Sequence, residues 1–115
     1  MAFTFKWTAE FTEWFESLTV AEKKSFAVSL FLLEEKGPLL GRPYADTLKG
    51  SAYPNMKELR ATHKGDVALR AAFAFDPKRN AILLIGGDKH GKRGFYGSLI
   101  RKADELYATH LASLK

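Results

Sequence analysis

The chain has 115 residues, 46% of them hydrophobic and 13% aromatic, which is enough apolar surface to bury a core and excludes a disordered protein. It carries 18 Lys and Arg against 13 Asp and Glu, a formal net charge of +5, and the absence of Cys excludes disulfides, thiolate metal sites and cysteine nucleophiles. The length suits one domain over residues 1–115, and with no run of about 18 apolar residues and no leader-like start we expect a cytoplasmic protein.

The first 36 residues predict a strand followed by two helices. Apolar residues alternate with polar ones at Phe3, Phe5 and Trp7, which is the pattern of a short half-buried strand. Thr8 is placed to cap a helix of about ten residues, in which an apolar stripe recurs at helical spacing: Phe11, Trp14, Phe15 and Leu18.

A second helix is predicted to begin at a capping box formed by Thr19 and Glu22. Its middle, SFAVSLFLLEEK, is nearly all apolar, so we expect it to be heavily buried. Gly37-Pro38 should end it, because Gly allows a left-handed exit and Pro cannot continue a helix.

Residues 37–55 are rich in Gly, Pro, Ser and Asn and predict a long surface connection, held down by Tyr44, Leu48 and Tyr53. Three strands should follow as an antiparallel meander, at about 56–62, 67–75 and 81–85. In the middle strand the bulky residues occupy odd positions and Ala or Arg the even ones, which predicts one core face and one shallow face. A long amphipathic helix from Phe95 to Leu114 is expected to close an α+β fold.

The positive charge is concentrated in the later part of the sequence. Residues 1–36 carry four Lys and six Glu, whereas residues 49–102 carry 12 basic and four acidic side chains. Such an excess attracts phosphate-rich partners, although a solvated basic surface explains a modest net charge equally well.

The first hairpin predicts a pair of arginines. If Gly65 is its centre, Arg60 lies directly opposite Arg70, on the face away from Leu59 and Leu69. Like charges opposite each other on a sheet are unfavourable, so either Glu58 or a polyanion must compensate them, and a structural Arg–Glu network is the slightly favoured account.

A second basic concentration runs from Gly86 to Tyr96, where the last strand leads into the last helix. Its glycines allow a ligand close to the backbone, and Tyr96 offers a hydroxyl and a ring beside a helix N-terminus. The spacing fits neither a Walker A loop nor a dinucleotide fingerprint, and no motif for a metal or a serine nucleophile occurs. His63 and His90 are interpreted as solvated turn residues and His110 as a hydrogen-bonded core histidine.

Four segments together resemble the RelE/ParE superfamily of toxins from toxin–antitoxin modules, in particular its phage-derived HigB-like branch. They are YPNMKELR (53–60), VALRAAFAFD (67–76), AILLIGGDK (81–89) and KRGFY (92–96). The resemblance implies a RelE-like small antiparallel sheet with strands and helices in the order β-α-α-β-β-β-α. It also implies an endoribonuclease without metal or cofactor that cleaves mRNA on the ribosome, and a helix-turn-helix antitoxin as partner.

The resemblance further implies roles for single residues. Arg60 and Arg70 would hold the scissile phosphate, Lys89 or Arg93 would contact phosphate or assist the leaving group, and Tyr96 would stack on a base or share in proton transfer. The general base stays unassigned. The RNA path would be lined by Lys57, His63, Lys64, His90 and Lys92.

Two alternatives remain open at this point. A ParE-like inhibitor of DNA gyrase would not need the clustered Arg60, Arg70, Lys89 and Tyr96. A non-catalytic RNA-binding accessory protein would use the same basic face without cleaving RNA.

Overall fold

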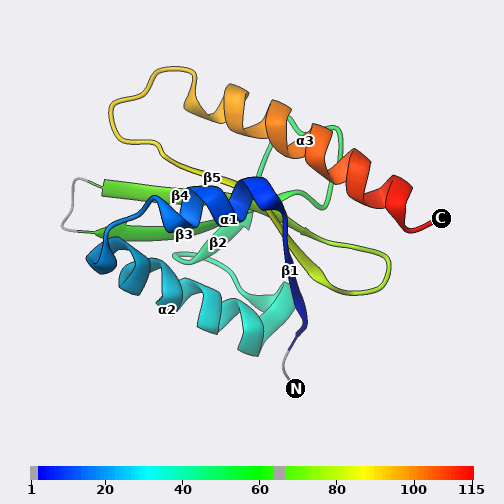
Figure 1. Cartoon of the computed structure of the whole chain (residues 1–115), viewed down its shortest axis with the longest axis horizontal. Coiled ribbons are helices and arrows are strands. Elements are labelled where there is room, and N and C mark those ends of the chain that lie inside the picture. Colours follow the sequence, from blue (N-terminus) through cyan, green and yellow to red (C-terminus); the bar gives the residue numbers. More distant parts are fainter. Residues whose placement is uncertain (1–2, 64–66) are drawn as a thin grey trace.

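The computed structural model describes residues 3–63 and 67–115, and in this part of the chain five strands form one sheet that packs against three α-helices (Figure 1). Their order confirms the predicted α+β class and the meander that precedes the last helix. The elements are β1 (Phe5–Trp7), α1 (Ala9–Glu16), α2 (Val20–Lys36), a 3₁₀ turn (Gly37–Leu39), β2 (Ala45–Thr47), β3 (Lys57–His63), β4 (Val67–Phe75), β5 (Ala81–Asp88) and α3 (Phe95–Ser113).

The predicted helix ends are confirmed. The Thr8 hydroxyl accepts a hydrogen bond from the Phe11 N–H, and Thr19 and Glu22 form the reciprocal capping box. Gly37 ends α2 with a φ of 55°, a left-handed value that favours glycine. Within the described ranges, no helix combines the length and the apolar content needed to cross a membrane.

The sheet has the order β1-β5-β4-β3-β2 and is mixed, which the sequence did not predict. The three central strands are antiparallel, whereas β1 runs parallel to β5, with Phe5 opposite Ala81 and Trp7 opposite Leu83. At the other edge β2 pairs antiparallel with β3. The connection 37–55 therefore contains a strand and a 3₁₀ turn, and the all-loop prediction for it is wrong.

Part of this connection is fastened to α3. Leu48 is buried, and the Tyr53 ring packs edge-on against Tyr107, with the ring centroids 4.9 Å apart. The Asp104 carboxylate accepts hydrogen bonds from the Ser51 hydroxyl and from the Ala52 N–H. The predicted anchoring by Leu48 and Tyr53 is confirmed, whereas Tyr44 is 36% exposed.

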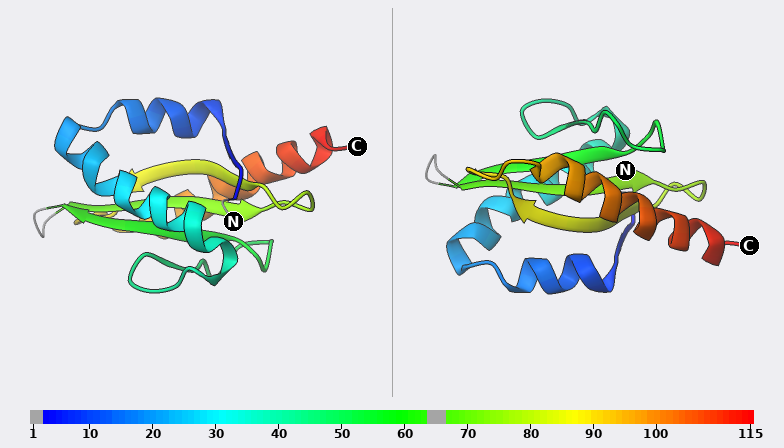
Figure 2. Two further views of the ribbon diagram at one scale, coloured as in Figure 1. Left: turned by 90° about the horizontal axis from the view of Figure 1, so that it is seen from below. Right: turned by 90° about the horizontal axis from the view of Figure 1, so that it is seen from above.

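The sheet lies between two helical layers, with α1 and α2 against one face and α3 against the other (Figure 2). The face that was predicted to be shallow is therefore covered, because Ala72 and Ala74 leave room for α3 to pack closely. The core beneath α1 and α2 includes Phe11, Phe26, Leu33, Leu59 and Phe73.

The middle of α2 is less buried than predicted. Phe26, Ser29 and Leu33 face the sheet, but Val28 is 53% exposed and Phe31 is 59% exposed. A helix that packs against a single layer buries only one face, however apolar the opposite one is.

Candidate functional site

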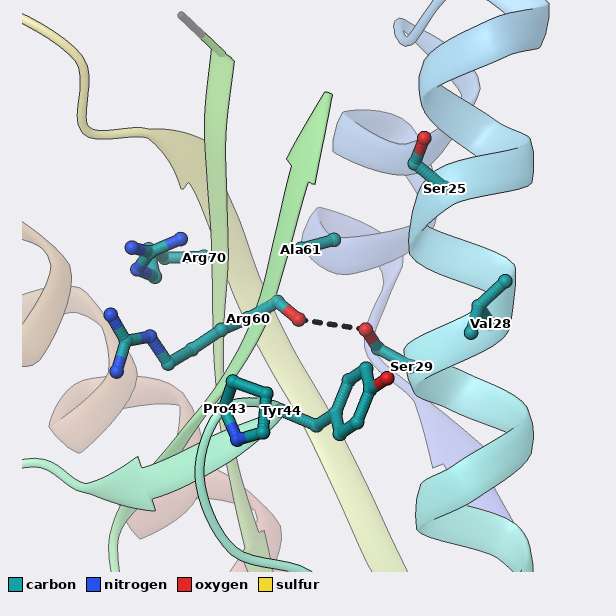
Figure 3. A pocket seen from close by; sticks show the side chains of 8 residues that line it. All are labelled: Ser25, Val28, Ser29, Pro43, Tyr44, Arg60, Ala61 and Arg70. Carbon is teal, nitrogen blue, oxygen red and sulfur yellow. Dashed lines mark hydrogen bonds between the residues drawn. The ribbon is translucent and has the colours of Figure 1, made fainter. Parts of the chain in front are cut away.

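Arg60 of β3 lies directly opposite Arg70 of β4, which confirms the predicted register. Both guanidinium groups point to the side of the sheet that α3 covers, away from α2 (Figure 3). Leu59 and Leu69 occupy the other face, in the core beneath α1 and α2. The fold therefore places two like charges side by side, as the sequence indicated.

The charge of Arg70 is compensated inside the protein. Arg70 is only 4% exposed, and its Nε lies 3.6 Å from Glu58 Oε1, while Glu58 is 6% exposed. The Arg70 Nη1 donates to the Leu69 carbonyl, but Nε has no hydrogen-bond partner in the described part of the chain. Glu58 thus forms the structural Arg–Glu pair that the sequence analysis favoured.

Tyr96, in the first turn of α3, extends this pair. Its hydroxyl donates a 2.7 Å hydrogen bond to Glu58 Oε1. Burial and the bond to Glu58 raise the pKa of Tyr96 above its usual value, and Arg70 opposes the shift. The Lys89 Nζ lies 5.6 Å from the centroid of the Tyr96 ring, within reach of a cation–π interaction. The result is a neutral tyrosine held between a carboxylate and a lysine.

Arg60, Lys89 and Tyr96 come from three different segments and line one hollow of about 490 Å³. We call it the central hollow. Arg70 lies beneath it and reaches it through Glu58. Of the five residues predicted to be catalytic, four therefore belong to one connected arrangement. The hollow is lined by Arg42, Asp46, Thr47, Leu48, Lys49, Glu58, Arg60, Lys89, Tyr96 and Ile100.

One wall of the central hollow was missed by the sequence analysis. Arg42 donates to Asp46 Oδ2 from Nε at 3.0 Å and from Nη2 at 2.7 Å. The hydrogen bonding from Arg42 lowers the pKa of Asp46, and the hydrogen bond that the Thr47 N–H donates to Asp46 lowers it further. Because β2 was not predicted, nothing in the sequence indicated that Arg42 and Asp46 would face Arg60.

The fifth predicted catalytic residue, Arg93, lies elsewhere. It lines a neighbouring hollow with Lys92, Ser98 and Lys102. Arg93 therefore does not line the central hollow together with Arg60.

Three of the residues predicted to line an RNA path, Lys57, His90 and Lys92, have described side chains. Lys57 donates to the Pro38 carbonyl at the end of α2 and alternates onto the face opposite Arg60. His90 and Lys92 are exposed on the loop between β5 and α3. The side chain of His63 and the turn 64–66, including Lys64, lie outside the described residues.

His110 is the hydrogen-bonded histidine that the sequence predicted. Its Nε2 lies 2.8 Å from Asp76 Oδ2, and the side chain of Asp76 is fully buried at the turn between β4 and β5. Among residues 3–63 and 67–115, no group of three or more His, Asp and Glu side chains is placed to hold a metal ion.

A second cavity of about 440 Å³ lies around the edge of β3, between α2 and the segment that precedes β2 (Figure 3). The Ser29 hydroxyl of α2 donates a 2.7 Å hydrogen bond to the Arg60 carbonyl, which fixes the strand where Arg60 projects. The cavity is lined by Ser25, Val28, Ser29, Pro43, Tyr44, Arg60, Ala61 and Arg70.

Comparisons with known proteins agree with this architecture. Residues 13–108 match the family described as Phage derived protein Gp49-like (DUF891). Over 113 residues the chain is 41% identical to the candidate toxin HigB2 of Mycobacterium tuberculosis, covering 95% of this chain but only 56% of that protein. Over 101 residues it is 44% identical to the candidate toxin HigB3 of the same organism, covering 87% of this chain and 86% of that protein.

A solved structure shares the fold. The free E. coli toxin RelE, carrying two arginine-to-alanine substitutions, superimposes with a TM-score of 0.66 at 11% sequence identity. The match covers 91% of this chain and 97% of the RelE chain.

Proposed function

The chain belongs to the phage-derived Gp49-like family, and we propose that it is a HigB-like toxin of the RelE superfamily, part of a toxin–antitoxin module, and that it cleaves mRNA. The proposed site of action is the translating ribosome in the cytoplasm, and the proposed inhibitor is a cognate helix-turn-helix antitoxin. The main support for the proposed nuclease activity is the central hollow. There Arg60, Lys89 and Tyr96 meet above the buried Glu58–Arg70 pair.

The residue types of the central hollow suit cleavage of a phosphodiester by the neighbouring 2′-hydroxyl. The reaction builds up negative charge on the phosphate, and fixed cations facing that charge lower the barrier. Arg60 binds the scissile phosphate, since a guanidinium stays charged at any physiological pH and matches the phosphate geometry. Arg70 contributes to catalysis only indirectly, because its positive charge is paired with the Glu58 carboxylate.

Tyr96 and Glu58 provide a route for the proton of the 2′-hydroxyl. As the 2′-oxygen attacks phosphorus, its proton passes to the Tyr96 oxygen, and the tyrosine proton moves along the existing hydrogen bond to Glu58 Oε1. The bond from phosphorus to the 5′-oxygen breaks, and the Lys89 ammonium donates a proton to that oxygen. The products are a 2′,3′-cyclic phosphate and a 5′-hydroxyl end.

The proposal is tested by inducing the protein in growing bacteria and mapping the ends of translated mRNA by primer extension. We expect growth arrest and new internal mRNA ends with the wild type, and neither with Arg60→Ala. Lys24→Ala, which removes an exposed cation from α2 on the other side of the sheet, should behave as the wild type.

Two results would contradict the nuclease. Loss of gyrase supercoiling activity without new mRNA ends would indicate a ParE-like inhibitor. Retention on translating ribosomes without cleavage would indicate a non-catalytic RNA-binding protein.

A further inference from the structure

The central hollow continues around the start of α3 through two further hollows. The next one shares Lys89 and Tyr96 with it, and the last shares Lys92, Gly94 and Phe95 with its neighbour. Together these two form a continuous depression, which we call the α3 groove. It is lined by Ile85, Gly86, Gly87, Lys89, Lys92, Arg93, Gly94, Phe95, Tyr96, Gly97, Ser98, Leu99 and Lys102.

The α3 groove is basic along its whole length. Four of its lining residues are cationic and none is acidic, whereas the central hollow contains Asp46 and Glu58. Lys102 forms an ion pair with Glu105, with Nζ and Oε2 3.8 Å apart, and both side chains are well exposed. Exposed pairs of this kind are weak, so they leave the charge available to a polyanion. The four cations are Lys89, Lys92, Arg93 and Lys102.

The groove also presents aromatic surface and bare backbone. Phe95 and Tyr96 pack edge to face with their ring centroids 5.2 Å apart, and both are partly exposed. A Cβ at Gly87 would lie 2.8 Å from the Phe95 ring, so glycine at this position lets the ring pack closely against the strand. Cations in a row beside aromatic rings are the combination that binds single-stranded nucleic acid, since the cations follow the phosphates and the rings stack on bases.

We propose that the α3 groove binds the RNA strand beyond the cleaved bond, with Arg93 and Lys102 contacting phosphates there and Phe95 contacting a base. This inference rests on the proposed nuclease function and assigns Arg93 to substrate binding instead of the cleavage centre. Lys102 is a further RNA-binding residue that the motifs did not indicate. We expect an RNA that contacts both the central hollow and Lys102 to need more than three nucleotides.

The test is RNA binding measured by fluorescence anisotropy as a function of salt. The probes are two 2′-O-methyl RNAs, which lack the attacking hydroxyl, of roughly ten and roughly three nucleotides. Log affinity falls as log salt rises, and we expect Arg93→Ala and Lys102→Ala each to make this negative slope shallower by about 0.7 for the longer RNA and to leave the slope for the shorter RNA unchanged. Lys24→Ala should change neither slope.

Several outcomes would contradict the proposal that the α3 groove binds RNA. They are unchanged slopes in both variants, equal changes with both RNAs, or no binding of the longer RNA by the wild type at low salt. Cleavage of translated mRNA by the wild type is measured in parallel. It tests the nuclease function independently of RNA binding by the α3 groove. If the salt slopes of the two variants become shallower as expected while the wild type cleaves no mRNA, the α3 groove is an RNA-binding surface and the nuclease proposal fails.

Discussion

The Tyr96 hydroxyl and the Glu58 carboxylate are joined by a 2.7 Å hydrogen bond that connects the first turn of α3 to β3. The same carboxylate is paired with Arg70 of β4, so one buried acid links three elements. A carboxylate in a basic site lowers its net positive charge, but it also fixes the orientation of a tyrosine and an arginine. The predictions about activity follow from this arrangement.

Replacing Tyr96 with Phe should reduce mRNA cleavage by about 100-fold or more, because the ring is kept while the proton route is removed. The loss of one hydrogen bond should lower the free energy of unfolding by only about 1 kcal/mol. Cleavage in a translating extract and urea unfolding measure the two effects. Tyr53→Phe is the matched control, since the Tyr53 ring packs on Tyr107 away from the central hollow. Full cleavage by Tyr96→Phe would exclude a chemical role for the hydroxyl.

Arg60→Ala and Arg70→Ala should differ in stability although both lower activity. Arg60 lines the hollow and is only partly buried, so its loss should reduce cleavage by about 100-fold and leave unfolding nearly unchanged. Removing Arg70 leaves the Glu58 carboxylate buried without its cation and should cost about 3–5 kcal/mol.

Urea unfolding of the two arginine variants checks this difference. The double variant Glu58→Gln with Arg70→Met should regain much of the lost stability, because no charge is then left unpaired. An Arg70→Ala protein as stable as the wild type would contradict the pairing.

Asp76→Asn should lower stability in a pH-dependent way. Burial alone would raise the pKa of Asp76, but the hydrogen bonds from His110 and from the N–H groups of Asn80 and Lys78 bring it below the ordinary value of 3.8. The stabilisation from this carboxylate is therefore fully present above pH 3.8 and is lost as the pH falls through the lower folded-state pKa.

Unfolding measured from neutral to acid pH tests the Asp76 prediction. We expect the variant to be less stable by about 1–3 kcal/mol at neutral pH, with a gap to the wild type that closes in acid. Glu13→Gln, an exposed carboxylate on α1, should show no such convergence. A gap that widens in acid would reverse the assigned direction of the pKa shift.

Gly86→Ala should destabilise the fold. A Cβ at Gly86 would overlap the Trp14 indole, which packs directly on this strand, and relieving that overlap costs about 1–3 kcal/mol. Thermal unfolding should show a clear drop for Gly86→Ala. Gly41→Ala is the control, because a Cβ there meets nothing within 4 Å, and it should leave the melting temperature nearly unchanged.

The part of the site that lies on paired strands could be predicted from the sequence. In an antiparallel hairpin the numbers of paired residues have a constant sum, so a turn centred on Gly65 was enough to place Arg60 opposite Arg70. The same alternation places Glu58 on the face of Arg60. Sequence could not decide whether Glu58 or a ligand compensates the arginines, because that depends on burial, and Arg70 proved to be covered.

The parts that failed depend on tertiary packing. β2 has only three residues, Ala45 to Thr47, which is too short for an alternating pattern, and its pairing with β3 places Arg42 in the site. The sequence did not indicate that Arg93 lines another hollow than Arg60, because the path of a loop rich in glycine is set by what it packs against. The exposure of Phe31 on α2 was missed for a related reason, since the nearly all-apolar middle of this helix does not reveal which face it buries.

The parallel pairing of β1 with β5 bears on how the protein folds as it is made. Trp7 pairs with Leu83, so β1 is synthesised well before β5 and can join the sheet only after β5 has been made. Tyr96 and Lys89 follow β5 in the sequence, so the central hollow also cannot form before these two residues have been synthesised. A nascent chain that lacks β5 therefore has neither the complete five-stranded sheet nor the complete central hollow.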